Sequence, residues 1–428
     1  MVLTALQALG AVPRGLRDAG LAAGASRWQT IRDLVLPRAW AGILSGAILA
    51  ISRGASEVAP VMFTGVAYFL PYLPSRLNDQ FMELGYHVFV LATQSPDVRQ
   101  TRPLLYASVV VLLSMTFLLH ALAMTLRRRA RTGAGRDLAD PLAAAAGPPP
   151  AGGATALQEA GPVRRGPRTV VGGQPPRVKM DVTGVHLQVR ERVLLRGVTL
   201  PIHEHRITAV IGPAGSGKAA LLRVMSRMAE EWEGARLEGR VLLDGTDIRT
   251  LPAEVVRRRV ALIERPVVFP RSIYDNVAYA PRLQGVRRKT DLDARVEASL
   301  RAAGLWREVR DQLNRPAMDL DPWQRVRLVL ARALAAGPEV LLVDASVIVM
   351  DRLALSTLEE LLDALKASHT LVIVTHDLGQ AARLSEYTAF LEKGELVEFG
   401  PTEDVFVHPQ KERTRAYLMR PYHYGTAP

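Results

Sequence analysis

A glycine-rich loop at residues 212–218 has the residue types and spacing of a phosphate-binding site. It reads Gly212-Pro213-Ala214-Gly215-Ser216-Gly217-Lys218 and is followed by Ala219. The β-branched run 207–211 leads into the loop, and an apolar helical run leaves it. Glycines let backbone N–H groups surround phosphate oxygens, the helix N-terminus contributes its dipole, and the lysine ammonium reaches the terminal phosphates. The pattern predicts a P-loop.

Two further apolar runs end on polar side chains. Residues 340–343 lead to Asp344, and residues 371–375 lead to His376. Because the carboxyl ends of parallel strands meet at one edge of a sheet, we expect an α/β domain with a magnesium-site carboxylate and a site histidine at that edge. A structural role without nucleotide remains the alternative for these residues, for Lys218 and for the loop glycines.

Composition excludes several classes of protein. The 428 residues are 48% hydrophobic and 22% charged, which argues against a wholly disordered chain or a fibre. The absence of cysteine excludes disulfide frameworks, thiolate zinc sites and cysteine nucleophiles. The net charge is +12, and residues 127–179 hold 10 basic and 3 acidic side chains, or +7 of it. This stretch is rich in glycine and proline, so we predict a disordered basic linker at 127–178 that contacts anionic lipid and no nucleic acid.

The sequence before that linker has membrane character. Residues 104–126 carry no charge and are followed by four arginines within 127–131, which predicts a transmembrane helix with its C-terminal end in the cytoplasm. A buried helix of a soluble protein is the alternative. A second apolar stretch covers about 39–70, and the polar residues 75–102 would form the outer loop between the two spans.

Two opposite charges interrupt the second apolar stretch. Arg53 and Glu57 stand four residues apart, so on a helix they share a face and can pair. Charge within a membrane usually marks a transport path, which is our interpretation of the pair. If the helix ends near Ser52, both residues are interfacial instead.

Residues 11–38 resemble the cytoplasmic coupling loop of ABC importer permeases. Asp18 stands where the family has glutamate, while Gly24 and the ending Leu36-Pro37 match the family pattern. The resemblance implies that residues 1–126 are the C-terminal part of a phosphate permease subunit, with further spans supplied elsewhere. It also implies that residues 11–38 contact an ATPase domain.

Residues 177–425 resemble ABC transporter ATPase domains, most closely the subunit of phosphate importers. The stretch 269–285, with its order Phe-Pro-Arg-Ser-Ile-Tyr-Asp-Asn, is nearly diagnostic of that class. The resemblance implies a P-loop ABC-type ATPase domain with a helical subdomain at 179–428. It implies ATP and Mg²⁺ as cofactors, and binding of the triphosphate by residues 212–219.

Several departures from the family fall on the groups that perform hydrolysis. Ala219 replaces the hydroxyl that coordinates magnesium, and Ala345 replaces the glutamate that polarises the attacking water. Glu264 stands in place of a metal-contacting glutamine and could ligate magnesium together with Asp344. An adenine-stacking aromatic is missing near Gln188.

The family's signature loop is also altered. It aligns with Asp321, Pro322, Trp323 and Gln324, in which the carboxylate repels phosphate, proline lacks an N–H and tryptophan fills the space left by glycine. Asp at an N-cap and Pro in the first turn begin a helix well, so we expect the helix to persist without its anion site.

We therefore expect a permease–ATPase fusion within a phosphate import system that hydrolyses ATP weakly or not at all. Its ATPase domain would lie on the cytoplasmic face of the inner membrane. Expected partners are permease subunits, an intact ATP-binding subunit and, indirectly, a phosphate-binding protein. The alternatives are an active ATP-hydrolysing subunit and a decaying fusion without function.

Overall fold

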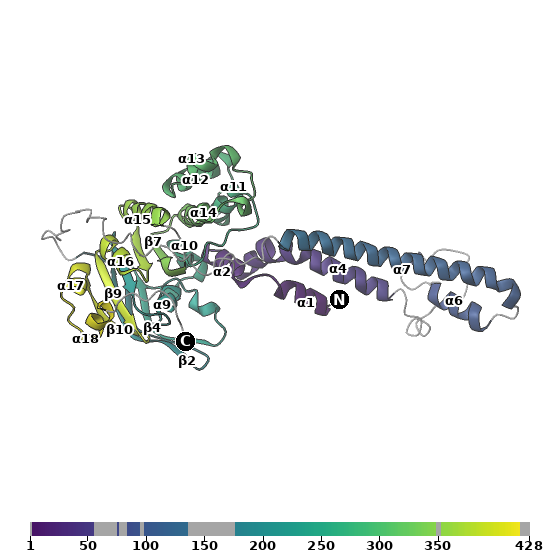
Figure 1. The fold of residues 1–428 in the computed structure, drawn as a ribbon, viewed down its shortest axis with the longest axis horizontal. Helices are drawn as coiled ribbons and strands as arrows, with labels where there is room; N and C mark the ends of the chain where they lie inside the picture. The colour runs from purple at the N-terminus through teal and green to yellow at the C-terminus, as the bar shows by residue number, and fades with distance from the viewer. Residues whose placement is uncertain are drawn as a thin grey trace, which may run out of the picture. The chain divides into compact units, whose positions relative to one another are not determined.

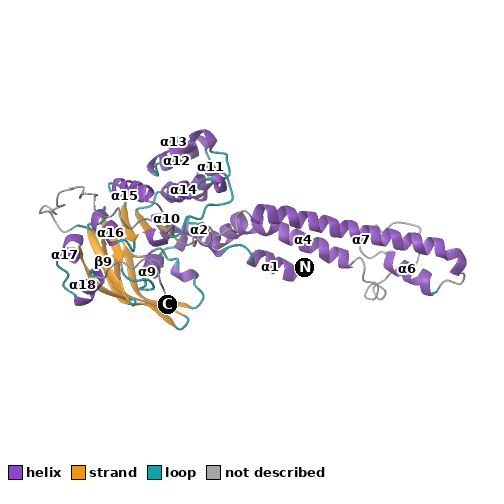
Figure 2. Cartoon of the chain, in the orientation of Figure 1, coloured by secondary structure: helices purple, strands orange, loops and turns teal. Residues whose placement is uncertain are grey.

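The computed structural model describes residues 2–54, 75–76, 84–94, 98–135, 176–347 and 352–419. The chain divides into two compact units (Figures 1 and 2). The first comprises Met1–Pro13 with Val35–Glu159, and the second comprises Arg14–Leu34 with Ala160–Pro428. The short segment 14–34, which resembles a coupling loop, thus belongs to the unit that carries the P-loop.

The first unit is helical in its described part. Its helices are α1 (Val2–Gly10), α4 (Leu36–Gly54), α6 (Leu84–Thr93) and α7 (Val98–Gly135). Helix α4 packs against α1 and α7, and α6 packs against α7. Two glycines one turn apart let α1 approach α4 closely. A Cβ at Gly42 would lie 2.8 Å from Ala8 Cβ, and one at Gly46 would lie 2.3 Å from Thr4 Oγ1.

Two described helices are long and apolar enough to cross a membrane, at Arg27–Ala50 and Arg99–Leu122. The span expected at 104–126 lies inside α7. This helix extends to Gly135, beyond the expected linker start at residue 127, because the arginines and alanines that follow the apolar run are good helix formers. Arg53 lies in α4, whereas Glu57 and residues 136–175 lie outside the described residues. The segment 75–102, expected as an outer loop, holds helix α6 and the start of α7 in its described part.

The second unit contains the two sheets. The six-stranded sheet has the order β10-β9-β3-β8-β7-β6, and its neighbours pair in parallel except for β10 with β9. The four-stranded sheet, β2-β1-β4-β5, is antiparallel. The strands are β1 (Val178–Val189), β2 (Arg192–His203), β3 (Ile207–Ile211), β4 (Ala235–Leu243), β5 (Thr246–Asp247), β6 (Val260–Ile263), β7 (Val340–Asp344), β8 (Thr370–Val374), β9 (Tyr387–Glu392) and β10 (Glu395–Pro401). The predicted α/β class is confirmed.

Helices flank these sheets, and α11, α12 and α14 pack against one another. The helices of this unit are α2 (Arg14–Ala22), α3 (Arg27–Thr30), α9 (Lys218–Met225), α10 (Ala253–Arg259), α11 (Ile273–Leu283), α12 (Lys289–Ala302), α13 (Trp306–Val309), α14 (Pro322–Ala335), α15 (Arg352–Leu365), α16 (Leu378–Leu384), α17 (Thr402–Val407) and α18 (Glu412–Leu418). A π-helical turn, Ile31–Val35, follows α3.

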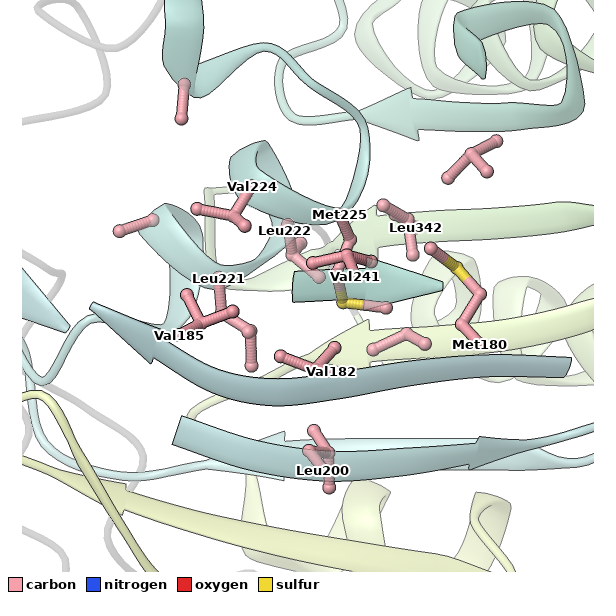
Figure 3. Packing of buried hydrophobic residues seen from close by; sticks show 14 of the residues in the cluster. Met180, Val182, Val185, Leu200, Leu221, Leu222, Val224, Met225, Val241 and Leu342 are labelled. Atoms are coloured by element: carbon pink, nitrogen blue, oxygen red, sulfur yellow. The ribbon is translucent and has the colours of Figure 1, made fainter. Parts of the chain in front are cut away.

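Helix α9 is held by the main hydrophobic core. Its residues Leu221, Leu222 and Met225 are fully buried and pack among side chains from both sheets, including Val182 and Leu342 (Figure 3). Since the P-loop joins β3 to α9, this core fixes both ends of the loop.

Asn276 ties α11 to the segment before it. Its side-chain amide accepts a hydrogen bond from Phe269 N at 2.7 Å and donates to the carbonyl oxygens of Phe269 and Ser272, both at 3.0 Å. The amide is fully buried, so these bonds replace its lost hydration. The stretch 269–276, singled out in the sequence, thus has a structural role at the entry to the helical subdomain.

A four-residue ionic network links strand and helix ends at the other end of the sheets. Lys179 Nζ lies 2.9 Å from Asp244 and 2.6 Å from Glu339, and Arg259 pairs with the same two carboxylates at 2.7 and 2.5 Å. Hydrogen bonding from Arg259, aided by Lys179 and opposed by burial, lowers the pKa of Glu339 to about 2.

This pKa predicts a pH-dependent contribution to stability. Since the folded-state pKa lies below the usual 4.5, the stabilisation is fully present above pH 4.5 and is lost as the pH falls towards 2. We expect Glu339→Gln to lower the free energy of unfolding by about 1 kcal/mol at pH 7, because the pair is partly screened by solvent. Urea unfolding of the full chain, followed by tryptophan fluorescence, measures the effect.

The difference between the wild type and Glu339→Gln should shrink to nothing between pH 4.5 and 2. Glu360→Gln, on the exposed side of α15, serves as the charge-matched control and should leave stability unchanged. An equal loss for both variants, or a difference that persists at pH 2, would contradict the assignment.

Candidate functional site

The P-loop has a backbone that only glycine accommodates at three positions. Gly212, Gly215 and Gly217 have φ values of 147°, 74° and 101°. A Cβ at Gly212 would lie 2.0 Å from the Leu391 carbonyl oxygen, and one at Gly217 would lie 2.7 Å from that of Leu194. Gly212 and Gly217 are therefore required by packing as well as by the turn. The loop keeps the shape of a phosphate cradle, so its residues fit a nucleotide.

Lys218 is the buried cation of this cradle. Its Nζ donates to the carbonyl oxygens of Gly212 and Pro213, both at 2.7 Å, and to Ser216 Oγ at 3.3 Å. Burial lowers the pKa of Lys218 to about 8, and the negative charge of Asp344 opposes that shift. An ammonium held mainly by neutral oxygens is ready to receive a phosphate group.

Asp344 and His376 lie at the same sheet edge as Lys218. Strands β7 and β8 are parallel neighbours, with Asp344 opposite Val374. The Asp344 carboxylate accepts hydrogen bonds from Ser346 N at 3.1 Å and from Ser346 Oγ. Desolvation and the charge of Lys218 lower the pKa of His376, whereas Asp344 and a hydrogen bond to the Gly212 backbone raise it. The predicted meeting of these strand ends is confirmed.

The metal edge is less complete than the phosphate cradle. Ala219 presents a methyl group. The Glu264 carboxylate is bound by Arg223, whose Nε lies 2.6 Å from Oε1 and whose Nη2 lies 2.6 Å from Oε2. Ala345 begins a 3-10 turn and packs against the second core cluster. Among the described residues, no group of three or more His, Asp or Glu side chains could hold a metal ion. Of the expected magnesium site, Asp344 stands at the sheet edge, whereas Ala219 offers no hydroxyl and Glu264 is engaged by Arg223.

A cavity of about 410 Å³ adjoins this edge. It lies among α2, α9, β6 and α14, and its lining includes Asp18, Ala219, Arg223, Glu264 and Asp344. The altered metal edge and the segment that resembles a coupling loop thus face one cavity.

Residues 14–34 pack against the rest of the P-loop unit through Leu21 and a central ion pair of Asp18. Leu21 belongs to the main core cluster. The Asp18 carboxylate lies 2.9 Å from Arg223 Nη2, so the aspartate reaches its partner despite being shorter than the family's glutamate.

Three further contacts flank the central pair. Arg27 pairs with Glu231 at 3.0 Å, and Arg271 donates to the Asp33 carbonyl oxygen at 2.6 Å. Gly24 has φ = 82°, and a Cβ there would lie 2.6 Å from Arg258 Cγ. Asp18 and Gly24, both singled out in the sequence, therefore contact the P-loop unit.

The altered signature segment begins helix α14, as the sequence predicted. Asp321 Oδ1 accepts from Gln324 N at 2.8 Å and Gln324 Oε1 accepts from Asp321 N at 3.2 Å, which is a capping box with Pro322 in the first turn. The Arg327 guanidinium lies 5.0 Å from the centre of the Trp323 ring. The Asp321 carboxylate thus accepts the hydrogen bond of a backbone N–H that could otherwise donate to a phosphate.

No local sequence pattern indicates the partners of the docked segment. Arg223 lies 205 positions from Asp18, and Arg271 lies 238 positions from Asp33. Arg223 sits one helical turn beyond the P-loop, where a basic residue on a helix surface is usually solvated. Only the fold brings it between two carboxylates.

A parallel sheet with a P-loop after β3 and a carboxylate at the end of β7 defines a P-loop nucleotide-binding protein. The family model described as ABC transporter matches residues 195–347. PstB of Salinibacter ruber, a phosphate import ATP-binding protein, is 44% identical over 245 residues, or 56% of this chain and 98% of that protein. The chain belongs to the ABC transporter family.

The first unit has its own match. The family model described as the inner membrane component of binding-protein-dependent transport systems matches residues 1–132. The polypeptide therefore fuses a permease segment to an ATP-binding cassette. With its long apolar helices, this segment makes the chain a membrane-associated protein.

Two solved structures also resemble the chain. CbiO1 of Clostridium perfringens, part of the cbiONQ ABC transporter complex, is 20% identical with a TM-score of 0.48, covering 54% of this chain and 91% of that one. The ATP-binding cassette MJ0796, in a dimeric post-hydrolysis state with ADP and Pi, is 24% identical with a TM-score of 0.46, covering 52% and 98%.

The pKa of Lys218 predicts how nucleotide binding depends on pH. Below about pH 8 the free protein carries the ammonium that phosphate requires, and above it the ammonium is lost. We expect the affinity of the full chain for a fluorescent ATP analogue to fall by about tenfold per pH unit above about pH 8. Lys218→Arg, which stays charged, should bind with little pH dependence. The same decline in both proteins would show that another group titrates.

Proposed function

We propose that this chain is the permease–ATPase fusion subunit of an ABC-type phosphate importer, in which the cassette binds ATP but hydrolyses it slowly or not at all. The observation that carries the proposal is the docking of residues 14–34 on the cassette of the same chain, centred on the Asp18–Arg223 pair at 2.9 Å. A segment from the permease match is thereby connected to the P-loop helix.

Phosphate as the solute is supported by sequence relationship. The cassette aligns with nearly the whole of a phosphate import ATP-binding protein at 44% identity. The stretch 269–285 is typical of that class, and Asn276 within it has a defined structural role. We place the cassette on the cytoplasmic face of the inner membrane, because that is where importers of this family meet ATP.

Weak hydrolysis is supported by three positions at the sheet edge and the signature segment. Ala219 offers no metal ligand, and Ala345 offers no base to the attacking water. The N-terminus of α14 is capped by Asp321, which repels phosphate. In a head-to-tail pair of cassettes, an intact ATP-binding partner would contribute its own signature to the P-loop of this chain.

Transport by the assembled system tests the proposal. Proteoliposomes would contain the full chain with permease and ATP-binding subunits of the importer. ATP is supplied on the side of the membrane that carries the cassettes, and the phosphate-binding protein on the opposite side. We expect uptake of labelled phosphate in preference to sulfate, and a loss of uptake when this chain is omitted. Uptake that is indifferent to this chain would end the proposal, and equal uptake of sulfate would end the assignment of the solute.

Restoring the missing groups should restore hydrolysis. We expect Ala219→Ser combined with Ala345→Glu to raise the ATP hydrolysis rate of the full chain, paired with an intact ATP-binding subunit, by about 10²- to 10⁴-fold. Phosphate release measures the rate. The P-loop of the partner subunit is inactivated by substitution while its signature is kept, so that only the site at this chain's P-loop can hydrolyse ATP. The same double variant with Lys218→Ala is the control. A double variant that hydrolyses ATP no faster than this control would show that positions 219 and 345 do not limit the hydrolysis rate.

A further inference from the structure

We propose that Glu264 sets how tightly residues 14–34 dock on the cassette, because it competes with Asp18 for the guanidinium of Arg223. The inference rests on the proposed role of this segment as the coupling loop, and is independent of which solute is transported. It assigns Glu264 to docking, whereas its position in the sequence predicts a metal ligand.

The geometry places two carboxylates on one guanidinium. Arg223 Nε and Nη2 bind Glu264, and Nη2 also donates to Asp18 Oδ2 at 2.9 Å. The Arg223 side chain is 12% exposed and that of Glu264 is 18% exposed, while Asp18 is 35% exposed. Trp232 lies against the guanidinium, 4.9 Å from ring centre to Cζ, and restricts its movement. Arg223 therefore remains beside both carboxylates.

Arg223, Asp18 and Glu264 together carry a net charge of −1, so one guanidinium is shared by two carboxylates. Asp18 is attracted by Arg223 but repelled by Glu264 across the same Nη2, and the repulsion cancels part of the attraction. Glu264 lies on the cassette whether or not the segment is docked, and it holds Arg223 by two bonds. The ionic contribution to docking is therefore smaller than an isolated Asp–Arg pair would give.

Other contacts keep the segment in place, so the charge tunes docking without creating it. Leu21 is buried in the main core cluster, and Gly24 lies against the aliphatic part of Arg258. Arg27 adds a pair with Glu231 at a more exposed position. A change of charge at position 264 should thus shift the docking equilibrium while leaving the docked geometry intact.

Engineered cysteines can measure docking directly, because the chain has none of its own. A Cβ at Gly15 would lie 3.4 Å from Val267 Cγ2, so Gly15→Cys with Val267→Cys can form a disulfide only when the segment is docked. The full chain in lipid nanodiscs is equilibrated in glutathione redox buffers. The ratio of closed to open disulfide gives the effective concentration of one cysteine at the other.

Neutralising each carboxylate should have opposite effects. We expect Glu264→Gln to raise the effective concentration about fivefold, and Asp18→Asn to lower it about fivefold. In the Asp18→Asn background, Glu264→Gln should have no effect, because the competition has been removed. Glu392→Gln, a charge-matched change at the pair with Arg413, should leave every value unaltered.

The outcomes separate the competing explanations. Additive effects of the two substitutions, or a decrease with Glu264→Gln, would overturn the proposal. Millimolar Mg²⁺ alone should not change the value, and an increase seen in the wild type but absent from the Glu264→Gln variant would make this residue a metal ligand. No disulfide in any variant would refute docking itself, whereas failed phosphate transport with an intact disulfide response would refute only the proposed function.

Discussion

The docking of residues 14–34 on the cassette is centred on one partly buried cation, Arg223. It stands one helical turn beyond the P-loop on α9, whose other face is fixed by the core between the two sheets. From that position its Nη2 binds both Asp18 and Glu264. The same helix thus carries the phosphate cradle at its N-terminus and the contact to the permease-derived segment along its length.

In the function that we propose, the cassette keeps its fold while its capacity for hydrolysis is reduced. The features that the fold needs are present: glycines at positive φ, a buried Lys218, parallel strands that bring Asp344 and His376 together, and a well-capped α14. The residues that our proposal connects with weak hydrolysis are Ala219, Ala345 and the signature segment. Asp321 shows both tendencies, because its carboxylate stabilises the helix by capping while excluding an anion from the same N–H groups.

Much of the cassette could be predicted from the sequence, because its signals are local. Apolar runs that end on Asp344 and His376 indicate a parallel sheet edge, and Asp321-Pro322 indicates a helix start. The role of Glu264 could not be predicted, because it depends on Arg223, which no local pattern places beside it. The end of α7 was missed because a glycine- and proline-rich stretch obscured the helix-forming residues just before it. Pairing of Arg53 with Glu57 stays a prediction.

The central claim is that residues 14–34 dock on the cassette of their own chain. Two differently tagged full-length chains, one with Gly15→Cys and the other with Val267→Cys, are co-expressed, oxidised and compared with a chain that carries both substitutions. We expect an internal disulfide in the doubly substituted chain and little cross-linked dimer from the split pair. Efficient cross-linking between the two tagged chains, without an internal disulfide, would contradict the claim and would place the segment on a neighbouring subunit.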